Sequence, residues 1–307
     1  MPDEHRSRTL RAFAALVVTM LLWSGNMIVG RAVSGEVPPF TLALIRWTGA
    51  FCVVLPFALR HMVADRAILL RAWKPVLLLG LTGVASFNAF IYSGLHHTTA
   101  SNAILLQAGI PPLVLLLDRL LFRIGASAWQ VAGVLLSTGG VLVIISAGEL
   151  GRLVALHFGA GDLLVLCGVA AWAVYTSLLR LRPACHPLSF LMVTFAIGVI
   201  AMAPLAATEA EAIVTIDWTP GVIAGCAYVA LFPSVVAYLF FNFAVAEVGA
   251  GRAGQTINLM PLFGALLAAA LLSEPLYRFH AVGMGLIAIG IALSWLSSRR
   301  AAPQERK

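Results

Sequence analysis

The chain repeats one pattern of residues at a spacing of about 150 positions. Residues 75–122 align with residues 225–272 at a constant offset of 150. Residues that flank these segments also pair, at an offset of 150 or 149. At an offset of 150 the coinciding pairs are Asn88 with Tyr238, Tyr92 with Asn242, Pro111 with Pro261, Gly133 with Gly283 and Gly140 with Gly290, and at 149 they are Trp23 with Trp172 and Pro38 with Pro187. The duplication predicts two copies of one structural unit, residues 1–150 and residues 151–307.

The composition indicates that both copies lie in a membrane. Hydrophobic residues make up 61% of the chain and charged residues 11%, and the mean hydropathy is +0.95, whereas about a quarter of the residues in soluble domains are charged. A spanning helix needs about 20 apolar residues. Ten segments qualify: Ala12–Gly30, Phe40–Leu59, Pro75–Leu95, Ala103–Phe122, Trp129–Ala147, Leu163–Leu179, Leu188–Ala206, Val222–Ala244, Ala253–Leu272 and Ala281–Leu296. The first is too long and too polar for a cleaved signal peptide, so we expect it to be retained.

The ten segments divide five and five, with the break at residues 148–159. Because each copy has an odd number of spans, the second copy enters the membrane from the opposite side. We therefore predict an all-α membrane protein with ten transmembrane helices, arranged as two inverted five-helix repeats around a central cavity. Inverted repeats of this kind support alternating access in transporters.

The basic residues predict the orientation, because lysine and arginine are enriched in cytoplasmic loops. Sixteen of the 20 fall on one side if the N-terminus is cytoplasmic: Arg6, Arg8, Arg11, Arg60, Arg66, Arg71, Lys74, Arg119, Arg123, Arg180, Arg182, Arg252, Arg299, Arg300, Arg306 and Lys307. We therefore expect both termini in the cytoplasm, and the net charge of +7 is explained without a nucleic-acid partner. Short loops without an Asn-x-Ser/Thr sequon suit a bacterial inner membrane.

Several motifs carry a resemblance to a known family. They are Leu22-Trp23-Ser24-Gly25-Asn26, Arg46-Trp47, Thr99 to Ala103 running to Pro111-Pro112, and Gly249 to Ala253 running to Pro261 and Ser273-Glu274-Pro275-Leu276. Over nearly its whole length the chain resembles the EamA-type transporters of the drug/metabolite transporter superfamily. The resemblance implies ten helices in paired inverted repeats, and export or exchange of small metabolites through a central cavity. The chain length and the aromatic and amide residues of the third, fourth, eighth and ninth spans resemble bacterial exporters of aromatic amino acids.

Polar and aromatic residues within the spans are candidates for contact with a substrate. Asn88 and Tyr92 are four residues apart and share a helix face, as do Tyr238 and Asn242 in the second copy. The predicted substrate-binding set is Trp23, Asn26, Arg46, Asn88, Tyr92, Gln107, Trp172, Tyr175, Tyr238, Asn242, Gln255 and Asn258. The alternative for each polar member is a hydrogen bond between packed helices. For Arg46, the one basic residue deep in a span, the alternatives are a substrate carboxylate or backbone carbonyls and helix ends.

Transport coupled to protons lacks an obvious carrier in this sequence. Of the 13 acidic residues only Asp118 falls inside a span, near the cytoplasmic end, and His96 and His97 stand at the outer end of the third span. Downhill facilitated export is the simpler mechanism, and proton-coupled drug or metabolite antiport is the alternative. The paired prolines in the fourth and ninth spans predict bends that are either static or hinges.

Functions other than transport find little support. The four cysteines lack the spacing of metal ligands, and the sequence contains no phosphate-binding loop. We expect no catalytic residues, no metal and no cofactor. The remaining alternatives are an intramembrane enzyme that modifies lipids and a receptor or assembly subunit. The expected partners are a small-molecule substrate and the lipid bilayer, and the expected state is a monomer or homodimer.

Overall fold

The computed structural model describes residues 2–33, 35–95, 97–98, 103, 106–149, 151, 159–272 and 275–296, among which no β-strand occurs. Its helices are α1 Pro2–Val33, α2 Pro39–Arg71, α3 Trp73–Gly80, η1 Leu81–Ser86, α4 Phe87–Leu95, α6 Ile110–Phe122, α7 Ala128–Ile145, α9 Ala160–Leu178, η2 Leu179–Leu181, α10 Pro187–Ala207, α11 Ala210–Val214, α12 Pro220–Ala230, η3 Leu231–Val236, α13 Ala237–Val248, α14 Ala250–Gln255, η4 Thr256–Asn258, α15 Leu259–Leu272 and α16 Arg278–Leu296. In this part of the chain eight continuous helical segments are long and apolar enough to cross a membrane.

The fourth and ninth predicted spans are interrupted helices. In the ninth, α14 ends at Gln255, one 3-10 turn follows, and α15 begins at Leu259. In the fourth, a turn at Gly109 precedes α6. The prolines of the fourth span therefore lie in the first turn of α6, where a missing backbone N–H costs little. The expected bend in the middle of a continuous helix is replaced by a break between two helical pieces.

The third and eighth spans each contain a π-helical turn, and the two turns are related by the repeat offset of 150 residues. The segment η1 joins α3 to α4, and η3 joins α12 to α13. Pro233 lies in η3 and lacks the N–H that an α-helix would use, so a local cause of this turn is visible in the sequence. The equivalent residue in η1 is Gly83. Wider turns leave carbonyl groups without their usual helical partner, and π turns are frequent at functional sites.

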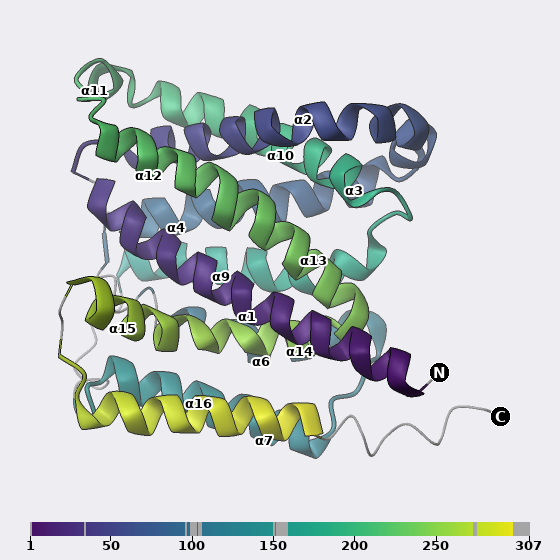
Figure 1. Ribbon diagram of the computed structural model, residues 1–307, viewed down its shortest axis with the longest axis vertical. Coiled ribbons are helices and arrows are strands. Elements are labelled where there is room, and N and C mark those ends of the chain that lie inside the picture. The colour runs from purple at the N-terminus through teal and green to yellow at the C-terminus, as the bar shows by residue number, and fades with distance from the viewer. Residues whose placement is uncertain are drawn as a thin grey trace.

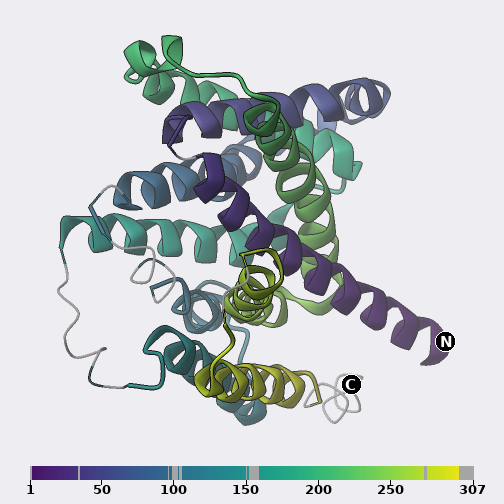
Figure 2. The same cartoon turned by 60° about the vertical axis from the view of Figure 1, so that its left-hand side comes forward.

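Helix contacts follow a two-fold pattern. The seventh span, α10, packs on its counterpart α2, and α16 packs on its counterpart α7. The pair α1 with α13 corresponds to the pair α9 with α4, and both pairs are in contact. Figures 1 and 2 both show α16 lying along α7 at one edge of the bundle. Together with the helical segments that are apolar and long enough to cross a membrane, this arrangement confirms the predicted all-α membrane fold with two inverted repeats.

At each end of the α2–α10 pair, a carboxylate from one repeat accepts hydrogen bonds from backbone N–H groups at the start of the helix in the other repeat. Glu209, just after α10, accepts hydrogen bonds from the backbone N–H groups of Phe40 and Thr41 at the start of α2, at 3.1 and 2.7 Å. At the other end, Asp65 of α2 accepts from the N–H of His186, which precedes α10, at 2.9 Å. A negative charge at a helix N-terminus is stabilising, so each repeat holds the start of its counterpart.

Four glycines let α7 and α16 approach until their backbones touch. A Cβ on Gly133 would lie 2.4 Å from the carbonyl oxygen of Gly290, and a Cβ on Gly140 would lie 2.6 Å from that of Gly283. The repeat offset relates Gly133 to Gly283 and Gly140 to Gly290, so the two contacts are images of each other. Small residues at helix crossings are typical of membrane proteins.

Substitution of Gly140 by valine should destabilise the bundle. The added Cβ meets the backbone of α16, which has no rotamer to escape the clash, and overpacking of this kind costs about 1 to 3 kcal/mol. Gly139→Val is the matched control, because a Cβ there has no atom within 4 Å. Thermal unfolding of both variants in detergent measures the difference. Equal unfolding midpoints for the two variants would contradict the close α7–α16 contact.

Candidate functional site

A cavity lies between the two repeats and draws its walls from both. Its lining residues are Trp23, Asn26, Met27, Arg46, Phe87, Asn88, Ile91, Tyr92, Gln107, Ile110, Trp172, Tyr238, Ile257 and Met260. The volume is about 60 Å³, so the cavity is small in this conformation. Eight of the twelve predicted substrate-binding residues are in this lining: Trp23, Asn26, Arg46, Asn88, Tyr92, Gln107, Trp172 and Tyr238.

Arg46 is buried at the cavity wall, with 5% of its surface exposed. Its Nε donates to the hydroxyl of Ser234 at 2.7 Å and one Nη donates to the carbonyl of Pro233 at 3.3 Å. The other Nη lies 3.4 Å from Oδ1 of Asn88, a long hydrogen bond. The guanidinium is also stacked over the ring of Trp47, 4.6 Å from its centroid. Arg46 is therefore held by backbone and side-chain groups while it still borders the cavity.

The carbonyl groups of the two π turns accept side-chain hydrogen bonds at equivalent positions. Pro233 accepts from the indole N–H of Trp23 at 2.9 Å, in addition to its bond with Arg46. Gly83, its counterpart in the first repeat, accepts from the hydroxyl of Tyr238 at 2.6 Å. Each donor belongs to the opposite repeat from its acceptor. The carbonyls freed by the π turns thus fix the aromatic side chains that wall the cavity.

Aromatic rings meet across the pseudo-two-fold axis. Trp23 and Trp172, counterparts at an offset of 149 residues, stand edge to face with their centroids 5.0 Å apart and their planes at 83°. Tyr238 lies against Trp172 at 5.9 Å and against Trp47 at 5.6 Å. Edge-to-face pairs at these distances are favourable beyond the area that they bury. The rings form a rigid wall that offers π faces to a ligand.

Tyr175 and Asn242 form a closed contact beside this wall. The hydroxyl of Tyr175 donates to Oδ1 of Asn242 at 2.6 Å, and the two side chains are 1% and 3% exposed. The ring of Tyr175 packs against Trp172, with 5.2 Å between centroids. Asn242 also lines a second pocket, of about 160 Å³, whose other lining residues differ from those of the cavity. The contact therefore lies between two hollow regions of the protein.

Comparisons with known proteins identify the family. Residues 10–146 and residues 159–296 each match the EamA-like transporter family. The chain belongs to the EamA family.

Its relatives include transporters from bacteria and archaea. An uncharacterized transporter of Archaeoglobus fulgidus is 30% identical over 280 residues, which cover 89% of this chain and 93% of that protein. The uncharacterized transporter YyaM of Bacillus subtilis is 28% identical over 216 residues, 70% of each chain. A solved crystal structure superimposes with a TM-score of 0.75 at 21% identity, covering 97% of this chain and 99% of that one. This last likeness concerns the fold, and the family identifies the protein as a multi-pass membrane transporter.

Two of the predicted substrate-binding residues of this EamA-family transporter, Gln255 and Asn258, lie outside the cavity lining. The side-chain amide of Gln255 donates to the carbonyl of Gly290 at 3.1 Å. That of Asn258 donates to the hydroxyls of Ser137 and Thr138, at 2.9 and 3.3 Å. Neither is among the cavity residues. These contacts join the ninth span to α7 and α16, which is the alternative that the sequence left open.

Sequence reasoning missed part of the EamA-family cavity. The additional lining residues are apolar: Met27, Phe87, Ile91, Ile110, Ile257 and Met260. Apolar residues within an apolar span carry no signal that separates a cavity wall from a lipid contact. Ser234, which holds Arg46, was also missed, because its counterpart in the first repeat is Val84. Among the described residues no group of His, Cys, Asp and Glu side chains is arranged to hold a metal ion.

Proposed function

We propose that this protein exports neutral amino acids, aromatic ones included, across the bacterial inner membrane by alternating access. The observation that carries the proposal is the cavity between the repeats, in which the buried guanidinium of Arg46 and the amide of Asn88 border aromatic walls. A carboxylate suits the guanidinium, since hydrogen bonds between charged partners contribute about 1.5 to 3 kcal/mol. Aromatic faces suit an apolar side chain or a cationic ammonium group.

The side-chain amides in the cavity wall complement an amino acid further. Gln107 is 8% exposed, and its Nε2 donates to the carbonyl of Ala103 at 3.3 Å. With the nitrogen so engaged, the amide oxygen is the group left to accept from a substrate ammonium. Trp23 and Trp172 approach the cavity from opposite repeats, so they would contact the substrate side chain from both. The same set of groups gives little reason to prefer a phosphate or a metal ion.

Counterflow in proteoliposomes tests this proposal. Liposomes that contain only this chain and are loaded with unlabelled phenylalanine should accumulate labelled phenylalanine transiently, and leucine or threonine should compete. Empty liposomes and liposomes with a heat-denatured preparation are the controls. Counterflow of a different metabolite class, with none for any amino acid, would reject the substrate proposal. No flux at all would favour the alternative of an intramembrane lipid-modifying enzyme.

Transport should follow the substrate gradient alone. None of the described residues that line the cavity is an aspartate or a glutamate. Asp118 is 5% exposed and accepts from Arg180 at 2.7 Å and from the hydroxyl of Ser177, away from the lining. His97 is exposed, and His96 lies outside the described residues. The described residues that line the cavity thus include no carboxylate or imidazole to carry a proton.

We therefore predict equal final phenylalanine concentrations on both sides of the liposome membrane, with or without an imposed pH difference. The measurement is the internal concentration at the plateau of uptake, with valinomycin and potassium holding the membrane potential at zero. Accumulation above the external concentration that follows the pH difference would overturn the facilitator mechanism. It would favour proton-coupled antiport instead.

A further inference from the structure

The second pocket has the chemistry of a binding site for a molecule with two opposite charges. It lies where α10 begins and α13 ends, and it is lined by Arg182, Pro187, Leu191, Leu239, Asn242, Phe243, Ala246 and Glu247. Its volume of about 160 Å³ exceeds the 60 Å³ of the central cavity. Figure 1 shows α13 ending and α10 beginning at the end of the bundle where the N-terminus lies, opposite α11. The pocket is therefore a vestibule on the N-terminal face.

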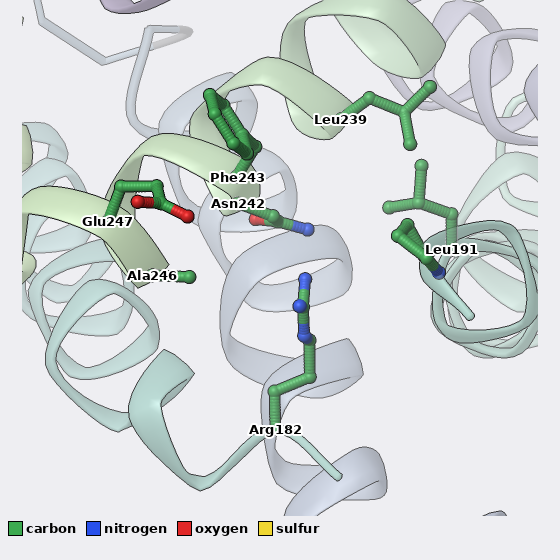
Figure 3. Close-up of a pocket in the computed structure, with 8 residues that line it drawn as sticks. Arg182, Leu191, Leu239, Asn242, Phe243, Ala246 and Glu247 are labelled. Atoms are coloured by element: carbon green, nitrogen blue, oxygen red, sulfur yellow. The ribbon is translucent and has the colours of Figure 1, made fainter. Parts of the chain in front are cut away.

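One cation and one anion face this vestibule. Figure 3 shows the side chain of Arg182 directed toward Asn242, with the carboxylate of Glu247 to one side. Within the described part of the chain, the guanidinium of Arg182 has no hydrogen bond or ion pair, and it lies 5.8 Å from the centroid of the ring of Phe190. Glu247 likewise forms no ion pair with another described residue, although it lines the same pocket. Two opposite charges that share a pocket without pairing leave room for a ligand between them.

The remaining walls are apolar and suit a hydrocarbon or aromatic side chain. Leu191 and Leu239 lie on the side away from Glu247, and Phe243 lies above Asn242 in the view of Figure 3. Pockets for small molecules commonly combine such apolar walls with a few placed polar groups. An anionic lipid headgroup would match Arg182 but would be repelled by Glu247, so the charge pattern favours a zwitterion.

Asn242 places the vestibule on a path to the central cavity. It lines the vestibule and at the same time accepts the hydrogen bond from Tyr175, whose ring packs on the cavity residue Trp172. A molecule in the vestibule is thus one closed side-chain contact away from the wall of the cavity.

We propose that the vestibule is a second amino-acid site, which binds the zwitterion on the N-terminal face before it reaches the central cavity. Arg182 binds the carboxylate, Glu247 binds the ammonium, and Leu191, Leu239 and Phe243 contact the side chain. The inference rests on the proposed function, since it assigns a second site to the same substrate class.

Competition by charge-modified substrates tests the assignment. Flux of labelled phenylalanine is measured in membrane vesicles sealed with the N-terminal face outward, with phenylalanine, N-acetylphenylalanine or phenylalaninamide as unlabelled competitor. Arg182→Gln should raise the inhibition constants of the two carboxylates about tenfold, as expected for a lost charge-assisted bond, and should change that of the amide less than twofold. Glu247→Gln should raise those of phenylalanine and phenylalaninamide and spare that of the N-acetyl compound. Vesicles of the opposite orientation should show neither effect.

Controls separate this site from other causes. Arg66→Gln removes an exposed charge next to Asp65, which accepts from the N–H of His186 just before α10, and should leave all three constants unchanged. Inhibition constants that shift equally for all three competitors would mean that Arg182 and Glu247 only stabilise the fold, and the proposal would be wrong. Loss of the Arg182 effect in phosphatidylcholine liposomes would assign that residue to anionic lipid. If wild-type vesicles carry no phenylalanine, the proposed function fails, whereas normal wild-type flux with unaltered variants rejects the vestibule site alone.

Discussion

Replacing Arg46 by glutamine should reduce phenylalanine flux by about 10 to 100-fold. The substitution removes a buried positive charge, and a charge-assisted hydrogen bond to a substrate carboxylate contributes about 1.5 to 3 kcal/mol, where 1.4 kcal/mol is a factor of ten. Phenylalaninamide has no carboxylate, so its inhibition constant should change far less. The measurement is competition in proteoliposomes, and for a site at the centre of the bundle the effect should be the same from both faces.

The matched variant is Ser234→Ala. It removes the hydroxyl that accepts from Nε of Arg46 at 2.7 Å but keeps the charge, so it should give a smaller loss with the same preference for carboxylates. Both proteins need an unfolding midpoint near that of the wild type for the comparison to hold. A fall of equal size for phenylalanine and its amide in Arg46→Gln would show that this arginine only joins the helices.

The duplication made the inner architecture predictable from the sequence. Residues that coincide at the repeat offset are images under a two-fold axis, so those close to the axis must meet their own counterparts. Trp23 and Trp172 do so with 5.0 Å between ring centroids. The glycines of α7 and α16 do not meet their own counterparts, but their two backbone contacts, Gly133 with Gly290 and Gly140 with Gly283, are images of each other. The ten spans were predicted from the apolar segments, and their inverted arrangement from the odd number of spans in each copy.

The π turns were not predictable in the same way. Residues 81–86 and 231–236 have the composition of any apolar helix, and a π turn differs from an α turn only in which carbonyl each N–H reaches. Pro233 signals a disturbance in one repeat, but Gly83 in the other does not. These turns determine which carbonyls are available to Trp23, Arg46 and Tyr238, so the detailed geometry of the site depended on two turns of which the sequence signals only one.

The faces of the spans were also ambiguous in the sequence. A helix that is apolar all round shows no amphipathic stripe, so an amide such as Gln107 or Gln255 can point to a cavity or to a neighbouring helix with the same pattern. The structure places Gln107 at the cavity and Gln255 at the contact with α16. The roles of the twelve candidates in substrate binding remain predictions, and the competition experiment with Arg46→Gln addresses that of Arg46.

Adding a single methyl group at Gly83 should strongly destabilise the protein. A Cβ there would lie 2.2 Å from the ring of Tyr175, which is 1% exposed and anchored to Asn242 at 2.6 Å. A large, buried and tethered ring has little freedom to move, so we expect Gly83→Ala to cost at least the 1 to 3 kcal/mol typical of overpacking. Gly30→Ala is the control, since a Cβ there has no atom within 4 Å and alanine favours a helix.

A double-mutant cycle with Tyr175→Leu decides whether the ring is the cause. Tyr175→Leu alone should be destabilising, because it leaves Asn242 without its donor and removes packing against Trp172. Combined with Gly83→Ala it should cost less than the sum of the two single changes, since the smaller side chain makes room for the methyl group. If the two losses of stability measured by thermal unfolding are additive, the alanine at Gly83 disturbs the backbone of the π turn and not the ring of Tyr175. The contact between the first π turn and Tyr175 would then play no part in closing the wall of the cavity.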